Sequence, residues 1–137
     1  MRLLILLSLC SALTLTPSLR AHHSFAAEYD ANKPITLKGK INKVDWVNPH
    51  SWIHVDVTDA NGVVTTWRCE TAPPNSLFRR GWTRSSLPKG TEVTVEGFRA
   101  KDNSPTMNAV SVTAGGKKVF TGSANSGAPD REGEPKQ

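Results

Sequence analysis

The chain has 137 residues, and its 17 lysines and arginines against 12 acidic residues give a formal net charge of +5. This length accommodates one compact domain. The charge excess is mild and argues against a nucleic-acid-binding protein, because such proteins carry a clustered basic face.

The first 21 residues have the composition of a secretory signal peptide. A short basic start at Arg2 is followed by the apolar run Leu3–Leu15, and Pro17 breaks the segment before the small residue Ala21. The run is too short for a membrane-spanning helix, which needs about 20 apolar residues. We therefore predict cleavage after Ala21 and a periplasmic or secreted mature protein with no membrane span.

Removal of this segment changes the charge and the cysteine content. The mature chain has 116 residues, and the loss of Arg2 and Arg20 lowers the net charge to +3. Cys10 is lost as well, and the large Leu9 before it disfavours a lipid anchor. Cys69 then stands alone and cannot form an internal disulfide. We expect a buried thiol there rather than a reactive one.

The mature chain is predicted to have three parts: an extended N-terminal arm over 22–34, a β-rich domain over 35–120 and a tail over 121–137. No part has the periodicity of a long helix. The tail contains no large apolar residue. Burial therefore cannot offset the entropy of ordering it, and we expect it to be disordered.

The β-rich domain begins with a long strand that changes phase. Apolar and polar side chains alternate over 35–41, and the apolar phase then moves to Val44 and Trp46. A β-bulge would produce this change, and Gly39 would help the strand bend. Asn48-Pro49 ends the run, because proline removes a ladder donor.

The next strand, over 51–57, separates its side chains onto two faces. The apolar set is Ile53, Val55 and Val57, and the opposite set is Trp52, His54 and Asp56. The turn 59–62 ends in Asn-Gly, a sequence that readily adopts positive φ, and it leads to a third strand over 63–70.

A short helix is expected after the third strand. Pro73–Ser76 opens it, Leu77–Arg80 forms its body, Asn75 or Ser76 caps it, and Gly81 ends it.

Two further strands follow, over 91–98 and 106–113, and a Gly-Gly turn then leads to Val119-Phe120. Three strands, a short helix and two strands is the order of an OB-fold. We predict an all-β, OB-like five-stranded barrel with one short helix between strands three and four. A meander sandwich is the alternative topology.

The four histidines form two pairs, His22-His23 and His50 with His54. Cleavage after Ala21 would give His22 a free α-amine, which chelates a metal together with its own imidazole. An imidazole from His23, His50 or His54 would complete a set of three nitrogens, which suits Cu(II). This set resembles the histidine brace of copper-dependent polysaccharide monooxygenases and of some periplasmic copper carriers.

His50 is the preferred partner for His22. Four residues of straight strand span about 13 Å, so His50 and His54 do not share one ion, and His50 follows Pro49 at a strand edge. The alternative is that His22-His23 is merely solvated and His50 bonds within its turn. No hydrolytic residue set is present, so we expect no enzyme. A copper-dependent oxidoreductase is the enzymatic alternative.

Tryptophans suggest a second, ligand-binding site at Trp52 and Trp46. An exposed Trp52, on the same face as His54, would stack against a sugar ring or a peptide. The alternative is that the tryptophans fill the core or cover the ends of the barrel.

Four short motifs occur in this order along the chain: His22-His23-Ser24-Phe25, Trp46-Val47-Asn48-Pro49-His50, Gly81-Trp82, and Leu87–Gly90 followed by Val93–Gly97. With these motifs the chain resembles, over residues 22–115, a family of small exported bacterial proteins classed only as a domain of unknown function. The resemblance implies an exported single domain and no assigned activity or ligand residues.

We therefore expect a periplasmic, non-enzymatic binding module with a copper site at His22 and His50, for which His23 and His54 are supporting candidates. The alternative is an OB-like interaction domain that uses the Trp52 face for a peptide, a protein or a glycan without metal. In either case the partner is an unknown periplasmic protein or a small ligand.

Overall fold

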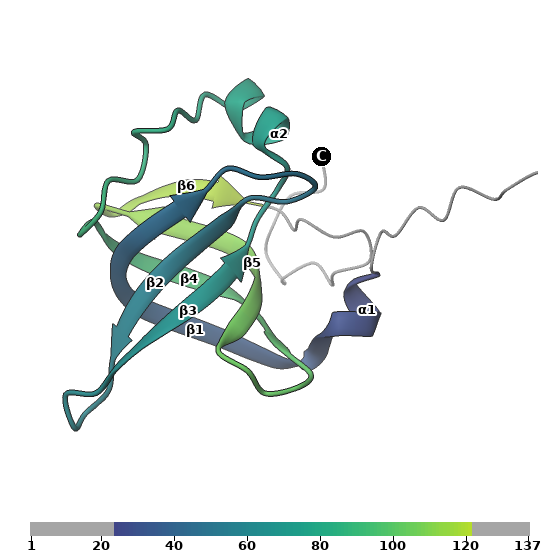
Figure 1. Ribbon diagram of the computed structural model, residues 1–137, viewed down its shortest axis with the longest axis vertical. Helices are drawn as coiled ribbons and strands as arrows, with labels where there is room; N and C mark the ends of the chain where they lie inside the picture. Colours follow the sequence, from purple (N-terminus) through teal and green to yellow (C-terminus); the bar gives the residue numbers. More distant parts are fainter. Residues whose placement is uncertain (1–23, 122–137) are drawn as a thin grey trace, which may run out of the picture.

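The computed structural model describes residues 24–121 and contains six strands and two short helices, which confirms the all-β prediction (Figure 1). The elements are α1 (Phe25–Glu28), β1 (Tyr29–Asp45), β2 (Trp52–Thr58), β3 (Val64–Glu70), α2 (Pro74–Arg79), β4 (Glu92–Ala100), β5 (Thr106–Ala114) and β6 (Lys117–Thr121). The predicted leader with Ala21, the histidines at 22 and 23, and the tail from 122 onward lie outside the described residues. Within 24–121, no helix is long and apolar enough to cross a membrane.

Hydrogen bonds join the strands into a ring. β1 pairs antiparallel with both β2 and β4, β2 pairs with β3, and β4 pairs with β5. A short parallel pairing, Arg68–Glu70 against Thr106–Asn108, then joins β3 to β5. β6 continues from β5 as a sixth strand, where the sequence indicated only a segment after a turn. In Figure 1, α2 lies above the ring and α1 lies beside the start of β1.

β1 pairs with two neighbouring strands, β2 and β4, because it is long and bends along its length. It pairs with β4 up to Lys40 and with β2 from Lys40 onward, and a register shift between Ile41 and Lys43 is the predicted bulge. The strands approach closely at Gly39, where an added Cβ would lie 2.3 Å from the carbonyl oxygen of Asp56.

α1 and the first part of β1 occupy the region expected to be an extended arm. Phe25 and Tyr29 are each 2% exposed and form a second, smaller core with Phe98, Ala100 and Val110. The rings of Phe25 and Phe98 meet edge to face, with centroids 5.4 Å apart. The helix is held because this core buries Phe25, at its first position, together with Tyr29, the extended residue that follows its last turn.

The short helix α2 lies between β3 and β4, where it was expected, but it begins differently. Pro74 starts it after Pro73, and no side chain caps it, so the expected cap at Asn75 or Ser76 is wrong. Proline suits this position because a first-turn N–H would have no partner inside the helix. Gly81, with φ of +87°, ends the helix as predicted.

The main core fills the interior of the ring, and its fully buried members include Ile53, Val55, Val95, Met107 and Val112. Cys69 is part of it, and desolvation raises the pKa of its thiol to about 12, in agreement with the expected buried role. Trp82 lies at its edge against Phe120, and its indole N–H donates to the Val119 carbonyl at 2.8 Å.

Candidate functional site

A buried carboxylate joins three segments that are distant in the sequence. Glu70, the last residue of β3, is 4% exposed. The Tyr29 hydroxyl donates a hydrogen bond to its Oε2 at 2.6 Å, and Nδ1 of His50 is hydrogen-bonded to its Oε1. The start of β1, the connection between β1 and β2, and the end of β3 therefore meet at one side chain.

Backbone pairing brings His50 to this carboxylate. Trp52, two residues after His50, pairs directly with Glu70 across β2 and β3. Ser51 extends the pairing beyond the strands, since its N–H donates to the Ala72 carbonyl and its own carbonyl accepts from Thr71. The side chain of His50 is 14% exposed and is held against Glu70 by this local geometry.

The electrostatics of the network follow from burial. Desolvation, together with the hydrogen bond to Glu70, raises the pKa of Tyr29 well above its ordinary value. The phenol is therefore a lasting donor to the carboxylate at neutral pH. Because Nδ1 of His50 faces Glu70, Nε2 is the ring nitrogen that remains to bind a ligand, and it makes no hydrogen bond to another residue in 24–121.

His54 lies at a different carboxylate. Its Nε2 is 2.8 Å from Oδ2 of Asp45, on the outer face of β1 and β2. Lys43 also binds Asp45, and its hydrogen bond is the main cause of the lowered pKa of that carboxyl, to which His54 adds. His50 and His54 thus lie at different carboxylates. Their spacing on a strand predicted this separation.

The described residues do not form a complete metal site by themselves. In the range 24–121, no three His, Cys, Asp or Glu side chains are grouped so as to hold a metal ion. The predicted copper set includes His22 and His23, which precede this range. Within the range, His50 contributes one imidazole with a carboxylate behind it.

The two tryptophans proposed for ligand binding have different environments. Trp46 stacks on Phe78 of α2, with ring centroids 5.0 Å apart, and also contacts Trp82. Its faces are thus used in packing at the edge of the main core. Trp52 is half-buried on the outer face of β2, and the guanidinium carbon of Arg68 lies 4.5 Å from its ring centre.

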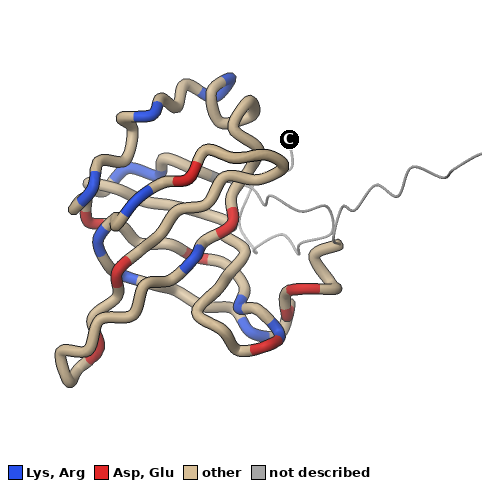
Figure 2. Tube along the Cα trace, viewed as in Figure 1, with Lys and Arg blue, Asp and Glu red and all other residues tan. Residues whose placement is uncertain are grey.

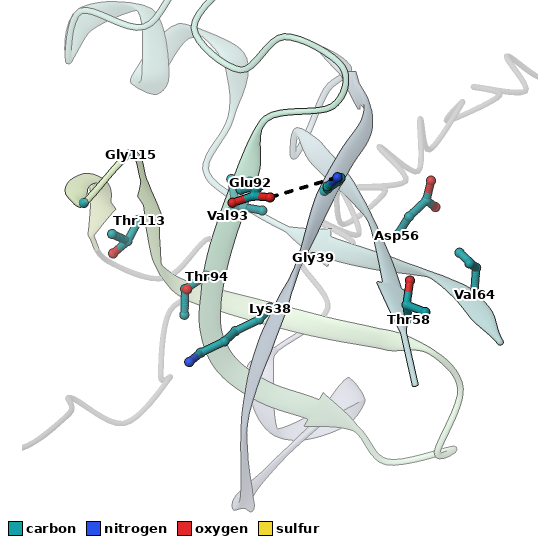
Figure 3. Close-up of a pocket in the computed structure, with 12 residues that line it drawn as sticks. Lys38, Gly39, Asp56, Thr58, Val64, Glu92, Val93, Thr94, Thr113 and Gly115 are labelled. Atoms are coloured by element: carbon teal, nitrogen blue, oxygen red, sulfur yellow. Dashed lines mark ion pairs between the residues drawn. The ribbon is translucent and has the colours of Figure 1, made fainter. Parts of the chain in front are cut away.

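One surface hollow, of about 800 Å³, lies over β1 and the adjacent ends of β2 and β4 (Figure 3). Its charged groups are largely paired, since Lys40 lies 4.0 Å from Glu92 and Asp56 accepts hydrogen bonds from Asn42 and Thr66. Lys38 also lines the hollow and forms no ion pair among residues 24–121, so a single exposed lysine is the charged group that the hollow offers to a ligand.

A second hollow, of about 750 Å³, is lined by Tyr29, Trp52 and Arg68 and therefore adjoins the Tyr29–Glu70–His50 network. The sequence predicted Trp52 here but missed the other members. Tyr29 lay in the presumed arm and Glu70 at the end of a strand, and only their hydrogen bond across the fold identifies them.

Charges of both signs are interspersed around the ring (Figure 2). The segment 71–91, which includes α2, differs in that its charged residues are all basic: Arg79, Arg80, Arg84 and Lys89. Four exposed cations on one short segment do not amount to the broad basic face of a nucleic-acid-binding protein.

The protein is a small all-β domain in which a Tyr29–Glu70–His50 network joins the start of β1, the β1–β2 connection and the end of β3. The chain matches a family of unknown function (DUF6152) over residues 11–108. Because the match covers more than half of the chain, the protein belongs to this family. No curated protein and no solved structure matches the chain.

Proposed function

We propose that this protein is a periplasmic, non-enzymatic copper-binding module in which His22 and His50 supply the ligands. The observation that carries the proposal is the hydrogen bond between Nδ1 of His50 and the buried Glu70. Metal-binding histidines almost always donate their second ring nitrogen to a carboxylate or carbonyl, which fixes the ring and increases the basicity of the coordinating nitrogen. His50 has this support, with Nε2 available for an ion.

Tyr29 strengthens the argument because it holds Glu70 in place from the other side. The His50 imidazole loses little conformational entropy on binding an ion, because the Glu70 carboxylate that orients it is already held by packing and hydrogen bonds. The carboxylate also supplies negative charge in a poorly solvated position, where it attracts a cation more strongly than it would in water.

The start of the described chain is tied to the same network. Phe25 packs against Tyr29, with ring centroids 5.7 Å apart, and it follows His22 by three residues. The covalent chain allows at most about 7 Å between the Cα atoms of His22 and Ser24. A free amine at His22 would therefore be produced close to a segment that is already anchored at Tyr29.

The finer fold assignment, an OB-like five-stranded barrel, belongs to this proposal as well. Support comes from the ring order β1–β2–β3–β5–β4, from the parallel contact of β3 with β5, and from the helix between β3 and β4. In this interpretation β6 is an addition to the barrel.

Titration of Cu(II) into the protein that begins at His22 tests the copper site. Acetylation of the His22 α-amine is expected to weaken binding at least about 10-fold, because the chelate loses its amine. Glu70→Gln is expected to weaken it about 10- to 100-fold by removing the carboxylate behind His50.

His50→Ala and His54→Ala form a matched pair for the same titration, since both remove an imidazole that is bonded to a carboxylate. We expect a large loss of affinity for the first variant and a small one for the second. Equal affinity in the original protein, the acetylated protein and the His50 variant would rule out the site.

The metal-free interaction domain has an observation of its own in its favour. Trp52 is half-buried at the edge of a hollow rather than sealed in the core. A protein that binds no copper, yet whose Trp52 signals respond to a peptide or a glycan, would support this second function.

A further inference from the structure

The hollow beside Trp52 has the size and the position of a small-molecule site. It measures about 750 Å³, within the range of about 300–1,000 Å³ that is usual for ligand pockets. Its walls come from α1, from the outer face of β2 and β3, and from the connection between β4 and β5. The lining residues that matter here are Glu28, Trp52, Arg68, Asp102, Ser104 and Thr106.

Two cations line the hollow, Arg68 and Lys101, but Lys101 Nζ already donates to the Ala26 carbonyl, so Arg68 is the one whose donors remain for a ligand. Its guanidinium stacks over the ring of Trp52, and it forms no ion pair or hydrogen bond with another residue in the described range. Stacking holds the guanidinium plane in one orientation and leaves its N–H groups without partners. An arginine held in this way is suited to bind a carboxylate through two parallel hydrogen bonds.

A second arginine–tryptophan pair shows what is different about Arg68. Arg99 lies 5.3 Å from the ring centre of Trp67, but its guanidinium already donates to the Asn103 carbonyl at 2.7 Å. One guanidinium nitrogen of Arg99, Nη2, is thus used within the protein and its Nε is buried, whereas Arg68 is exposed and lines a hollow.

The other lining groups restrict the class of anion. The carboxylates of Glu28 and Asp102 lie at the same hollow and would repel a ligand with several negative charges. Asp102 already accepts hydrogen bonds from the backbone and side chain of Ser104. A carboxylate has further lone pairs, however, that can accept from a ligand hydroxyl, and the hydroxyl of Thr106 can exchange hydrogen bonds with such a ligand. The lining therefore favours one carboxylate combined with several hydroxyls.

We propose that this hollow binds a small polyhydroxy monocarboxylate, such as a sugar acid, with its carboxylate on Arg68. The site uses neither His22 nor the free face of His50, so it is independent of the copper proposal. Binding is expected in metal-free protein.

The test is an NMR titration of ¹⁵N-labelled protein, in the presence of a chelator, with sodium glucuronate. Glucose and sodium acetate serve as probes that carry only the hydroxyls or only the charge. We expect the Trp52 indole and Arg68 Nε signals to shift with glucuronate, with a Kd of about 1 mM, a value typical of a ligand of this size.

Arg68→Gln is expected to raise the Kd at least about 10-fold, since it removes a charge-assisted bidentate contact. Arg84→Gln makes the same change in net charge on an exposed residue outside the hollow, and its Kd should stay within about 2-fold of the original. Arg68→Lys keeps the charge but loses the planar fork, so its Kd should lie between these two.

The absence of shifts with glucuronate, or an unchanged Kd in a folded Arg68→Gln protein, would overturn the site. Shifts of equal size with acetate would overturn the assignment to a polyhydroxy ligand. If Arg68→Gln does not fold, Thr106→Val makes an isosteric change at the lining residue that pairs with Arg68 across β3 and β5. It should then raise the Kd about 3- to 10-fold, the effect of one lost hydrogen bond, and an unchanged value would contradict the proposal.

Discussion

At the scale of single residues, Tyr29 links the smaller core to the hydrogen-bond network around Glu70. Its ring packs in the smaller core with Phe25, and its hydroxyl donates to Glu70. A buried acceptor that loses a donor costs more than the net value of the bond, because the acceptor cannot turn to water instead. Tyr29 should therefore contribute to stability through both packing and polar satisfaction.

Tyr29→Phe keeps the packing and removes the donor. We expect the free energy of unfolding at pH 7 to fall by about 1–3 kcal/mol. Urea denaturation followed by circular dichroism measures this loss. A variant as stable as the original would show that Glu70 finds another donor when the hydroxyl is absent.

The same residue predicts how stability depends on alkaline pH. The pKa of Tyr29 is raised in the folded protein, so the unfolded chain loses its phenolic proton first, above about pH 10. The stabilising contribution is fully present below that pH and declines as the pH rises. The decline should be smaller in Tyr29→Phe, where the raised pKa of the buried Cys69 thiol still lowers stability at alkaline pH. Tyr29 is the single tyrosine of the sequence, so absorbance at 295 nm follows its ionisation directly.

At the scale of the elements, β1 and β2 depend on one close approach. The Asp56 carbonyl and the Val55 side chain occupy the space that a side chain at Gly39 would need. Backbone atoms of a paired strand cannot move aside without separating the strands. The bend of β1, and with it the pairing to both β2 and β4, thus requires glycine at this position.

Gly39→Ala should lower the free energy of unfolding by about 3 kcal/mol or more, at the upper end of the range for overpacking. Gly62→Ala is a useful comparison, because Gly62 has φ of +82° but no atom within 4 Å of an added Cβ. Its loss should be about 1–2 kcal/mol, from backbone strain alone. Equal losses in chemical denaturation would show that the steric contact at Gly39 relaxes.

Local patterns predicted the elements between Leu37 and Gly81 well. The bulge of β1, the two faces of β2, the hairpin and the position of α2 all depend on alternation and on turn residues within a short window. α1 and β6 were missed for the opposite reason. Each forms around aromatics, Phe25 and Phe120, that are buried by partners far along the chain.

At the scale of the whole molecule, two cores divide the stability unevenly. The main core fills the ring of strands, whereas the smaller one holds α1 and the start of β1 against β4 and β5. A peripheral segment held by a few aromatic contacts opens at lower free energy than the centre of the domain. Since this segment precedes Tyr29, its docking also determines how firmly the Tyr29–Glu70–His50 network is held.

Phe25→Ala should therefore act locally. A core Phe→Ala change usually costs about 3–5 kcal/mol, but here we expect global stability to fall by only about 1–2 kcal/mol, because α1 can undock alone. Native-state hydrogen exchange should show loss of protection over α1 and the start of β1, with Ile53 and Val95 still protected. Uniform loss throughout the ring would show that the two cores unfold as one.

The candidate site was only partly predictable for a similar reason. His50 and His54 were recognised because histidines in short sequence spacings suggest ligands, and Trp52 because its strand face was evident from alternation. Tyr29 and Glu70 were not recognised, since they are 41 residues apart and ordinary in their local settings. Arg68 likewise was recognised as a candidate ligand-binding residue only from the structure, because it lines a hollow and its guanidinium lies over the Trp52 ring.

The sequence by itself determined the β-rich character, the membership of a family of unknown function, and the course of the chain from the bulged strand to the short helix. These features arise from contacts within a few residues. The closure of the ring, the second core under α1, and the carboxylate shared by Tyr29 and His50 were decided by the tertiary structure alone. They depend on long-range pairings, such as β3 with β5, whose formation no local pattern encodes.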